Sequence, residues 1–203
     1  MNAVSELAEN VVPSIVVLSV WWAFLSTLEV LLTPHQLLDD EPPPEGGGTT
    51  GTNEDRLAAL KALDPAFSVE AFLGGARGVY EAVLRAYAQG DVEALRPLLS
   101  VDVFDVFAAS CAERAARGET LEMALLGIDG AEIAHVWTQP DATEIAVLFR
   151  ARVTRVERSA SGDVVDGDPD SVATTGDLWT FARPASTASA EWLIVATDEI
   201  QPS

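Results

Sequence analysis

The chain has 203 residues, and its 32 acidic and 12 basic side chains give a formal net charge of -20. A surface this acidic repels phosphate backbones, so the composition argues against a nucleic-acid-binding protein and favours basic partners. Cys111 is the one cysteine in the sequence, which excludes an internal disulfide framework. Apart from an apolar N-terminal segment and a linker, the length predicts one globular domain of roughly 140–150 residues.

The N-terminal segment predicts a membrane helix. A short tail, residues 1–9, is followed by the uncharged run NVVPSIVVLSVWWAFLSTL. About 19 residues at ~1.5 Å rise cover roughly 29 Å, enough for a bilayer core. We predict a single transmembrane helix over residues 10–33, with Trp21, Trp22 and Phe24 as membrane-anchoring residues. A cleaved signal peptide and a helix packed against a partner complex stay open as alternatives.

Residues 34–56 read as an acidic linker rich in proline and glycine, which has no apolar face to bury. It joins the helix to a domain over residues 57–203. The acidic N-terminal tail lacks basic residues and offers little resistance to crossing a membrane, so we expect the C-terminal domain on the cytoplasmic side. The expected location is the inner (cytoplasmic) membrane.

The domain begins with helical patterns and continues with strand patterns. A short helix is expected over residues 57–63, and Ser68 and Gly90 delimit a longer one. Asp91 begins a third, short helix, and a fourth runs from the N-cap Ser100 to Gly118. Strands are expected over residues 121–138, kinked at Gly127 or Gly130, and then over 143–158, around 172–183 and in the final WLIVATDEI. Helices followed by an antiparallel meander predict an α+β fold with the helices on one face of the sheet.

Several segments of the domain, in this order and spacing, resemble a known family. They are FSVEAFLGGARGVYEAVLRAYAQGDVEALRPLLSVDVFDVFAA, ERAARGET, GIDGAEI, VVDGDPDSV, DLWTFAR and WLIVAT. Together they resemble the bacterial TimA family, relatives of Tim-forty-four, the mitochondrial inner-membrane protein that tethers a matrix Hsp-seventy chaperone to the presequence translocase. The resemblance covers about residues 64–198.

The resemblance implies a cystatin-like (nuclear-transport-factor-two-like) fold with an apolar pocket between the helices and a curved sheet. It also implies an adaptor or assembly role at the inner membrane. Two departures stand out. Arginines usually follow the family's membrane helix, whereas Glu29 and an acidic linker stand here. The turn before Trp192 reads Ala188-Ser189-Ala190-Glu191 in place of Asp-Pro-Asn.

Aromatic residues of the domain have two interpretations, core packing and the lining of a pocket for an acyl chain or an apolar segment of a partner. Their spacing does not separate the two. The candidate pocket residues are Phe72, Tyr80, Phe104, Phe107, Trp137, Phe149, Trp179 and Phe181.

One basic cluster is the candidate docking patch of the domain. It is formed by Arg150, Arg152, Arg155 and Arg158. On a strand, Arg150 and Arg152 share a face. Either these arginines form a solvated face paired with neighbouring acids, or they dock to an acidic protein, RNA or lipid headgroup.

The sequence shows no catalytic or metal-binding motif, and we expect no enzyme activity, no metal and no cofactor. Tyr80 or His135 with Asp105 is the nearest approach to an acid–base pair. The acid-rich loop around Asp163 and Asp170 lacks the spacing of a calcium-binding EF-hand, so a polar hairpin loop is expected.

These observations predict a membrane-anchored adaptor, or an assembly or translocation-associated protein, without catalytic activity. Its expected partners are inner-membrane proteins or a chaperone, and the membrane itself through the N-terminal helix. The alternative is a lipid or small-molecule binding module that uses the apolar pocket. The sequence leaves the oligomeric state open.

Overall fold

The computed structural model describes residues 52–139, 142–184 and 191–200. The chain divides into two compact units, Met1–Gly48 and Thr49–Ser203, and all described residues lie in the second. The predicted tail, the predicted transmembrane helix at 10–33 and most of the linker lie outside the described residues. Among the described helices, none combines the length and the apolar character needed to span a bilayer.

The helices begin and end at capping residues. Helix α2, Asn53–Leu63, begins four residues before the predicted one, because Thr52 and Asp55 form a reciprocal capping box. Helix α3, Val69–Gln89, begins after Ser68, whose hydroxyl accepts a hydrogen bond from the backbone N–H of Ala71. It ends at Gly90 in the left-handed conformation, with φ 69°. The predicted bounds of α3 are thus confirmed.

Two further helices precede the sheet. Helix α4, Val92–Leu95, follows the predicted cap Asp91. Helix α5, Val101–Ala116, begins after Ser100, whose hydroxyl accepts from the backbone N–H of Val103. Gly118 has φ 68° and follows the last turn. Residue identities at helix ends therefore predicted all three boundaries, because each cap acts over only a few residues.

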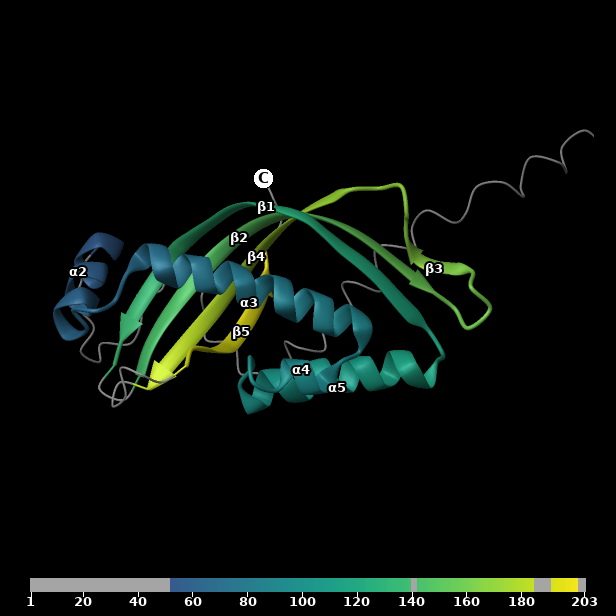
Figure 1. Ribbon diagram of the computed structural model, residues 1–203, viewed down its shortest axis with the longest axis horizontal. Helices are drawn as coiled ribbons and strands as arrows, with labels where there is room; N and C mark the ends of the chain where they lie inside the picture. The colour runs from purple at the N-terminus through teal and green to yellow at the C-terminus, as the bar shows by residue number, and fades with distance from the viewer. Residues whose placement is uncertain (1–51, 140–141, 185–190, 201–203) are drawn as a thin grey trace, which may run out of the picture. The chain divides into compact units, whose positions relative to one another are not determined.

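A five-stranded antiparallel sheet forms the rest of the domain (Figure 1). Its main path runs β1-β2-β4-β5, with β3 paired to β2 alone. The bounds are Thr120–Thr138 for β1, Ala142–Arg158 for β2, Val164–Gly167 for β3, Ala173–Pro184 for β4 and Leu193–Glu199 for β5. The predicted α+β fold with an antiparallel meander is confirmed.

Register shifts interrupt the β1–β2 ladder at three places, between Leu125 and Gly127, between Ile128 and Gly130, and between Ile133 and His135. Two of them fall at the predicted kink positions. Extra residues on one strand bend it and increase its twist. The sheet accordingly curves around α3, which lies across its concave face (Figure 1).

The segment between β2 and β4 differs from the prediction of a polar loop, because it contains strand β3. Val156 and Glu157 of β2 pair with Gly167 and Asp166 of β3. Gly167 has φ 80°, a backbone conformation that favours glycine. An ion pair from Asp166 to Arg155 fixes the strand against β2. Alternation of apolar residues could not reveal β3, since its two valines are both exposed.

Candidate functional site

The concave face of the sheet, beneath α3, is where the predicted pocket would open. Aromatic rings fill this face. The ring of Tyr80 stacks on Phe149 at 4.5 Å between centroids and lies 4.7 Å from Trp179. Phe149 also contacts Phe181 edge-on at 6.5 Å. Tyr80, Phe149 and Phe181 are each at most 1% exposed, so these side chains form the centre of the hydrophobic core.

The other candidate pocket residues are distributed around this centre. Phe72 packs edge-on against Phe181 and Trp192. Phe104 lies under the guanidinium of Arg96, and half-buried Phe107 packs against Tyr87. Trp137 is half-buried on β1 beside His135, 5.4 Å away. The structure therefore joins Phe72, Tyr80, Phe149, Trp179 and Phe181 through ring contacts. Phe104 belongs to the same hydrophobic core without such a contact to them, Phe107 packs against that core, and Trp137 lies apart on β1. A ligand pocket among these residues stays a prediction.

A polar group lies at one edge of the aromatic cluster. The hydroxyl of Tyr80 donates to a carboxylate oxygen of Asp177 at 2.6 Å, and the hydroxyl of Thr175 donates to the same oxygen at 2.9 Å. Burial raises the pKa of Asp177 above its usual value, an effect that both hydrogen bonds oppose. Burial also raises the pKa of Tyr80, and the charges of Asp177 and Glu199 add to that rise. Tyr80 therefore stays neutral and acts as a donor.

Sequence reasoning missed this partner of Tyr80. It weighed Asp105, which the structure places on the exposed side of α5, while the partner Asp177 lies on β4, 97 residues from Tyr80. Exposed His135 contacts Trp137, and His35 lies outside the described residues. The available sequence signal was a tyrosine in a predicted helix and an aspartate in a predicted strand. Only the packing of α3 on the sheet brings Tyr80 and Asp177 together.

The arginines of the candidate docking patch all have carboxylate partners. On the convex face, Arg150 pairs with Glu132 at 3.0 Å and Arg152 pairs with Asp129 at 2.9 Å. Hydrogen bonding by Asp129, together with its charge, raises the pKa of Arg152. Both pairs are about half exposed, so solvent screens them. Docking of an acidic partner to this face stays a prediction, and it would have to compete with the two acids.

The other two arginines of the cluster hold the far end of the sheet together. Arg158 pairs with Glu122 of β1 at 2.9 Å. Arg155 binds Glu157 at 3.0 Å and also Asp166 of β3. The two contacts of Arg155 are less exposed than those of the convex face, whereas Glu122 is itself exposed. They indicate a structural role for Arg155 and Arg158 in fixing β1 and β3 to β2.

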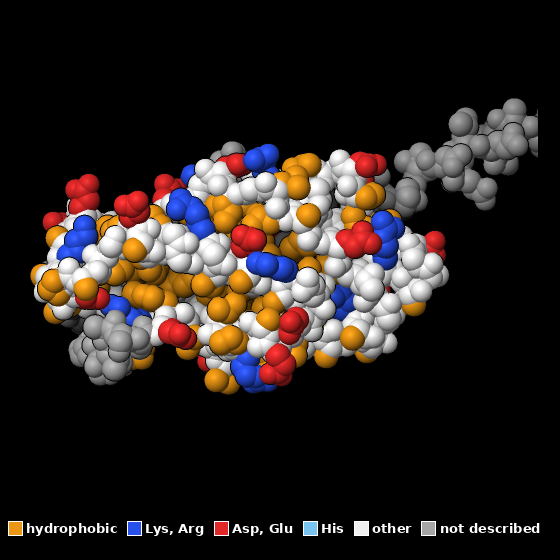
Figure 2. All heavy atoms as spheres, viewed as in Figure 1, with side chains coloured by type: hydrophobic (Ala, Val, Ile, Leu, Met, Phe, Trp, Pro, Cys, Tyr) orange, Lys and Arg blue, Asp and Glu red, His pale blue; other side chains and the backbone are white. Residues whose placement is uncertain are grey.

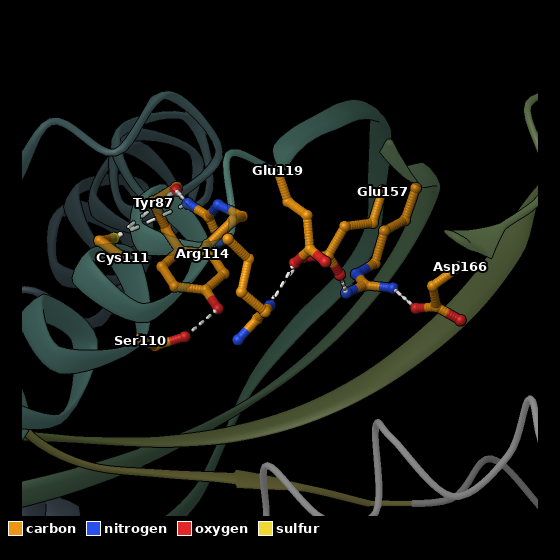
Figure 3. A network of polar contacts seen from close by, with 9 residues as sticks. Tyr87, Ser110, Cys111, Arg114, Glu119, Glu157 and Asp166 are labelled. Atoms are coloured by element: carbon orange, nitrogen blue, oxygen red, sulfur yellow. Dashed lines mark hydrogen bonds and ion pairs between the residues drawn. The ribbon is translucent and has the colours of Figure 1, made fainter. Parts of the chain in front are cut away.

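The ion pairs around Arg155 continue toward the helices (Figure 3). Arg117, which follows α5, contacts both Glu119 and Glu157. Nearby, the buried guanidinium of Arg114 donates to the backbone carbonyl of Tyr87 in the last turn of α3. The partial negative charge at a helix C-terminus stabilises such a cation. The Arg114 guanidinium also lies 4.7 Å from the centre of the Tyr87 ring.

This end of the domain also contains the only cysteine. Burial raises the pKa of the Cys111 thiol, which keeps it protonated beside Arg114.

No group of three or more histidine, cysteine or acidic side chains among the described residues could hold a metal ion. Asp166, which lies on β3, forms an ion pair with Arg155. The predicted anchoring residues Trp21, Trp22 and Phe24 lie outside the described residues.

Comparisons with known proteins give consistent matches to one family. The model of the Tim44-like domain family matches residues 54–199. The mitochondrial import inner membrane translocase subunit TIM44-1 of Arabidopsis thaliana is 25% identical over 132 residues, which are 65% of this chain and 28% of that protein. The human subunit TIM44 is 26% identical over 128 residues, 63% of this chain and 28% of that protein. The chain thus matches little more than a quarter of the length of these relatives.

Solved structures are more distant. The intermembrane space region of the chloroplast protein ARC6 has a TM-score of 0.47 at 11% identity, over 63% of this chain and 95% of that chain. A ketosteroid isomerase-like protein from Erwinia carotovora atroseptica has a TM-score of 0.35 at 18% identity, over 67% of this chain and all of that chain. Scores this low carry no argument about fold or function. The cystatin-like assignment therefore rests on the sequence resemblance.

Proposed function

Because the chain belongs to the Tim44-like domain family, we propose that it is a non-catalytic adaptor that binds other proteins at an inner membrane. In this proposal residues 10–33 anchor the chain in the membrane, and the acidic linker connects the anchor to the Tim44-like domain on the cytoplasmic side. The names of the matched relatives, subunits of an inner membrane translocase, support an association with membrane protein complexes.

The observation that carries the proposal is the filled concave face of the sheet. An enzyme or a small-molecule carrier of this architecture needs space beneath the helix. Here Tyr80, Phe149 and Phe181 occupy that space with their own rings. Asp177, a partly buried acid at the edge of the aromatic cluster, is committed to hydrogen bonds from Tyr80 and Thr175. This arrangement supports a rigid binding scaffold rather than a reaction site.

Charge supports the choice of a protein partner. Eight arginines of the domain are engaged in ion pairs with its own acids. The acids exceed the basic residues by 20 in the whole sequence, so the surface that remains is strongly acidic. It repels anionic lipid headgroups and nucleic acids and attracts basic protein segments.

A crosslinking experiment tests the proposal. The full chain with a C-terminal tag is expressed in a bacterial membrane background, crosslinked, solubilised and analysed by mass spectrometry, beside a chain that starts at Thr49. We expect specific membrane proteins or a chaperone to be crosslinked to the full chain and to be depleted with the shorter chain, which lacks the predicted anchor. The proposal would be overturned if neither chain captured a specific protein and native mass spectrometry showed a copurified lipid or metabolite.

A further inference from the structure

The two edges of the sheet differ in what covers them. At one edge, the connection between α4 and α5 pairs with β5. Ser100 donates its backbone N–H to Ile194 at 2.8 Å, and Ile194 donates its own to Leu98 at 2.9 Å. At the other edge lies β1, and within the described part of the chain no strand pairs with its outer side. An unpaired edge offers backbone donors and acceptors to another extended chain.

Side chains occupy part of this edge. Asn53 of α2 donates to the carbonyl of Ala134, and Arg77 of α3 donates to the carbonyl of Ala131 at 3.5 Å. Both contacts lie in the C-terminal half of β1. Among the described residues, no side chain donates such a hydrogen bond to the backbone of Leu121–Leu125. The pairing of this stretch with β2 contains no register shift. The N-terminal half of β1 is therefore the open part of the edge.

The register identifies which backbone groups point outward there. The carbonyl of Ala131 faces outward, and Ala131 stands opposite Phe149 of β2. Outward and inward positions alternate along an antiparallel ladder. From Thr143 to Arg158, each residue of β2 has a partner on β1 in unbroken sequence, so the alternation can be followed along β2. It assigns outward N–H and C=O groups to three residues of the open stretch, which are Leu121, Met123 and Leu125.

A hollow of about 370 Å³ adjoins this stretch. Its walls are formed by the C-terminal half of α3, four consecutive β1 residues, β2, and the connection between β3 and β4. The lining residues are Arg85, Ala88, Gln89, Leu121, Glu122, Met123, Ala124, Thr154, Val156 and Pro169. Neighbouring side chains of a strand point to opposite faces. Four consecutive lining residues therefore mean that the hollow reaches around the edge of β1. Hydrophobic side chains also reach the surface alongside α3 (Figure 2).

The surroundings favour one kind of occupant. Leu126, at a register shift next to the open stretch, is 49% exposed, which adds apolar surface. The basic side chains beside the hollow are neutralised, since Arg85 pairs with Glu81 and Arg158 pairs with Glu122. The chain as a whole is strongly acidic. A partner segment with alternating apolar and basic residues would complement both the hollow and this charge.

We propose that the edge of β1 over Thr120–Leu125 binds an extended segment of a partner protein by strand addition. The apolar side chains of that segment enter the hollow between α3 and β1, and its basic side chains lie on the outer face. This inference rests on the proposed adaptor function and locates the surface that function would use. The outward backbone groups of Leu121, Met123 and Leu125 form the ladder.

A pair of synthetic peptides tests the inference on the full chain in lipid nanodiscs. The first is the fluorescent peptide Lys-Val-Lys-Leu-Lys-Val-Lys, and the second has the same sequence with the backbone nitrogens methylated along both edges. Both have the same charge and side chains, but the second cannot form the ladder. We expect at least about tenfold weaker binding of the methylated peptide in fluorescence anisotropy, the size expected for losing a few net hydrogen bonds.

Substitutions on β1 give a second readout. Met123→Pro removes an outward N–H and leaves the β1–β2 ladder intact, so it is expected to weaken the unmethylated peptide by about tenfold. Met123→Ala keeps the N–H and is expected to keep the difference between the two peptides. Equal binding of both peptides would reduce the interaction to charge attraction and overturn the proposal. So would the absence of binding up to millimolar peptide, or a dimer of the full chain that buries this edge. Crosslinked partners that map elsewhere would refute this site alone and leave the adaptor function standing.

Discussion

The surroundings of the two ends of α3 differ in their chemistry. At its N-terminal end, the rings of Phe67, Phe72, Phe181 and Trp192 pack together, with neighbouring centroids 5.0–6.4 Å apart. At its C-terminal end, Arg114 of α5 donates to the backbone carbonyl of Tyr87. Beside this contact, a network of ion pairs joins Arg117, Arg155, Glu157 and Asp166 (Figure 3). The first end depends on removing apolar surface from water, and the second depends on charge.

This difference bears on how the domain would serve as an adaptor. Packing of aromatic rings responds little to salt, although this end also contains the ion pair of Asp64 with Arg183. The end with the larger network of ion pairs is expected to respond more strongly to ionic strength. The proposed strand-addition site lies toward the charged end. There, Glu122 of β1 forms an ion pair with Arg158 of β2. We infer that the aromatic end supplies most of the stability and that the charged end sets the position of β1 and β3.

The largest expected effect comes from the aromatic core. Phe149→Ala removes a fully buried ring that stacks on Tyr80, and we expect a loss of about 3–5 kcal/mol in the free energy of unfolding. Urea denaturation followed by circular dichroism measures it. Leu126→Ala is the matched control, because its half-exposed side chain predicts a change within about 0.5 kcal/mol. A loss below about 1 kcal/mol for Phe149→Ala would show that stability does not concentrate in this core.

The backbone of β3 gives the next largest effect. In Gly167→Ala, the added methyl group would overlap the carbonyl oxygen of Arg155, and φ 80° is unfavourable for alanine. We expect a loss of about 2 kcal/mol or more by urea denaturation. Gly162→Ala is the control. Its φ of 91° is also positive, but the methyl group would meet open space, so only the conformational cost of about 1 kcal/mol remains. Similar losses in both variants would contradict close packing of β3 on β2.

Local features of the structure could be predicted from the sequence, and contacts across the sheet could not. Ser68, Gly90 and Ser100 marked helix ends because a cap acts within its own turn. Alternation of apolar residues located β2 because one face of that strand is buried. In contrast, β3 was missed because four residues with two exposed valines carry no alternation.

The candidate sites show the same limit. Sequence reasoning identified the aromatic residues but could not tell which of them meet, since Tyr80 and Phe149 join only through the packing of α3 on β2. It identified the arginine cluster but not its acidic partners, because Asp129 and Glu132 reach Arg152 and Arg150 through the β1–β2 register. That register depends on three shifts, of which glycines could suggest two, while the shift between Ile133 and His135 has no glycine beside it.

The ion pairs of the charged end predict a moderate, salt-dependent effect. Asp166→Ala removes the contact to Arg155, and we expect a loss of about 1–2 kcal/mol at low salt that decreases at high salt. Glu132→Ala is the matched control, since its pair with Arg150 is more than half exposed and predicts about 0.5 kcal/mol or less. Urea denaturation at two salt concentrations measures both. If the loss in Asp166→Ala were the same at both, charge would not be what holds β3.

The smallest expected effect is a change in how stability depends on pH. Burial raises the pKa of Asp177 above its ordinary 3.8, so the folded chain holds this proton to higher pH than the unfolded chain does. Stability contributed by that proton is present at acidic pH and is lost as pH rises through the raised pKa. Asp177→Asn removes this titration, so its stability relative to the parent chain should rise with pH above 3.8.

Asp64 titrates in the opposite direction and serves as the comparison. A hydrogen bond from Arg183, at 2.9 Å, lowers the pKa of Asp64, so its contribution is present above pH 3.8 and is lost as pH falls through the lowered value. Asp64→Asn should therefore lose stability relative to the parent at neutral pH and approach it in acid. Urea denaturation from about pH 2 to about pH 7 measures both slopes. Slopes of the same sign would mean that burial does not govern Asp177, because only opposite shifts of the two carboxyl groups separate the variants.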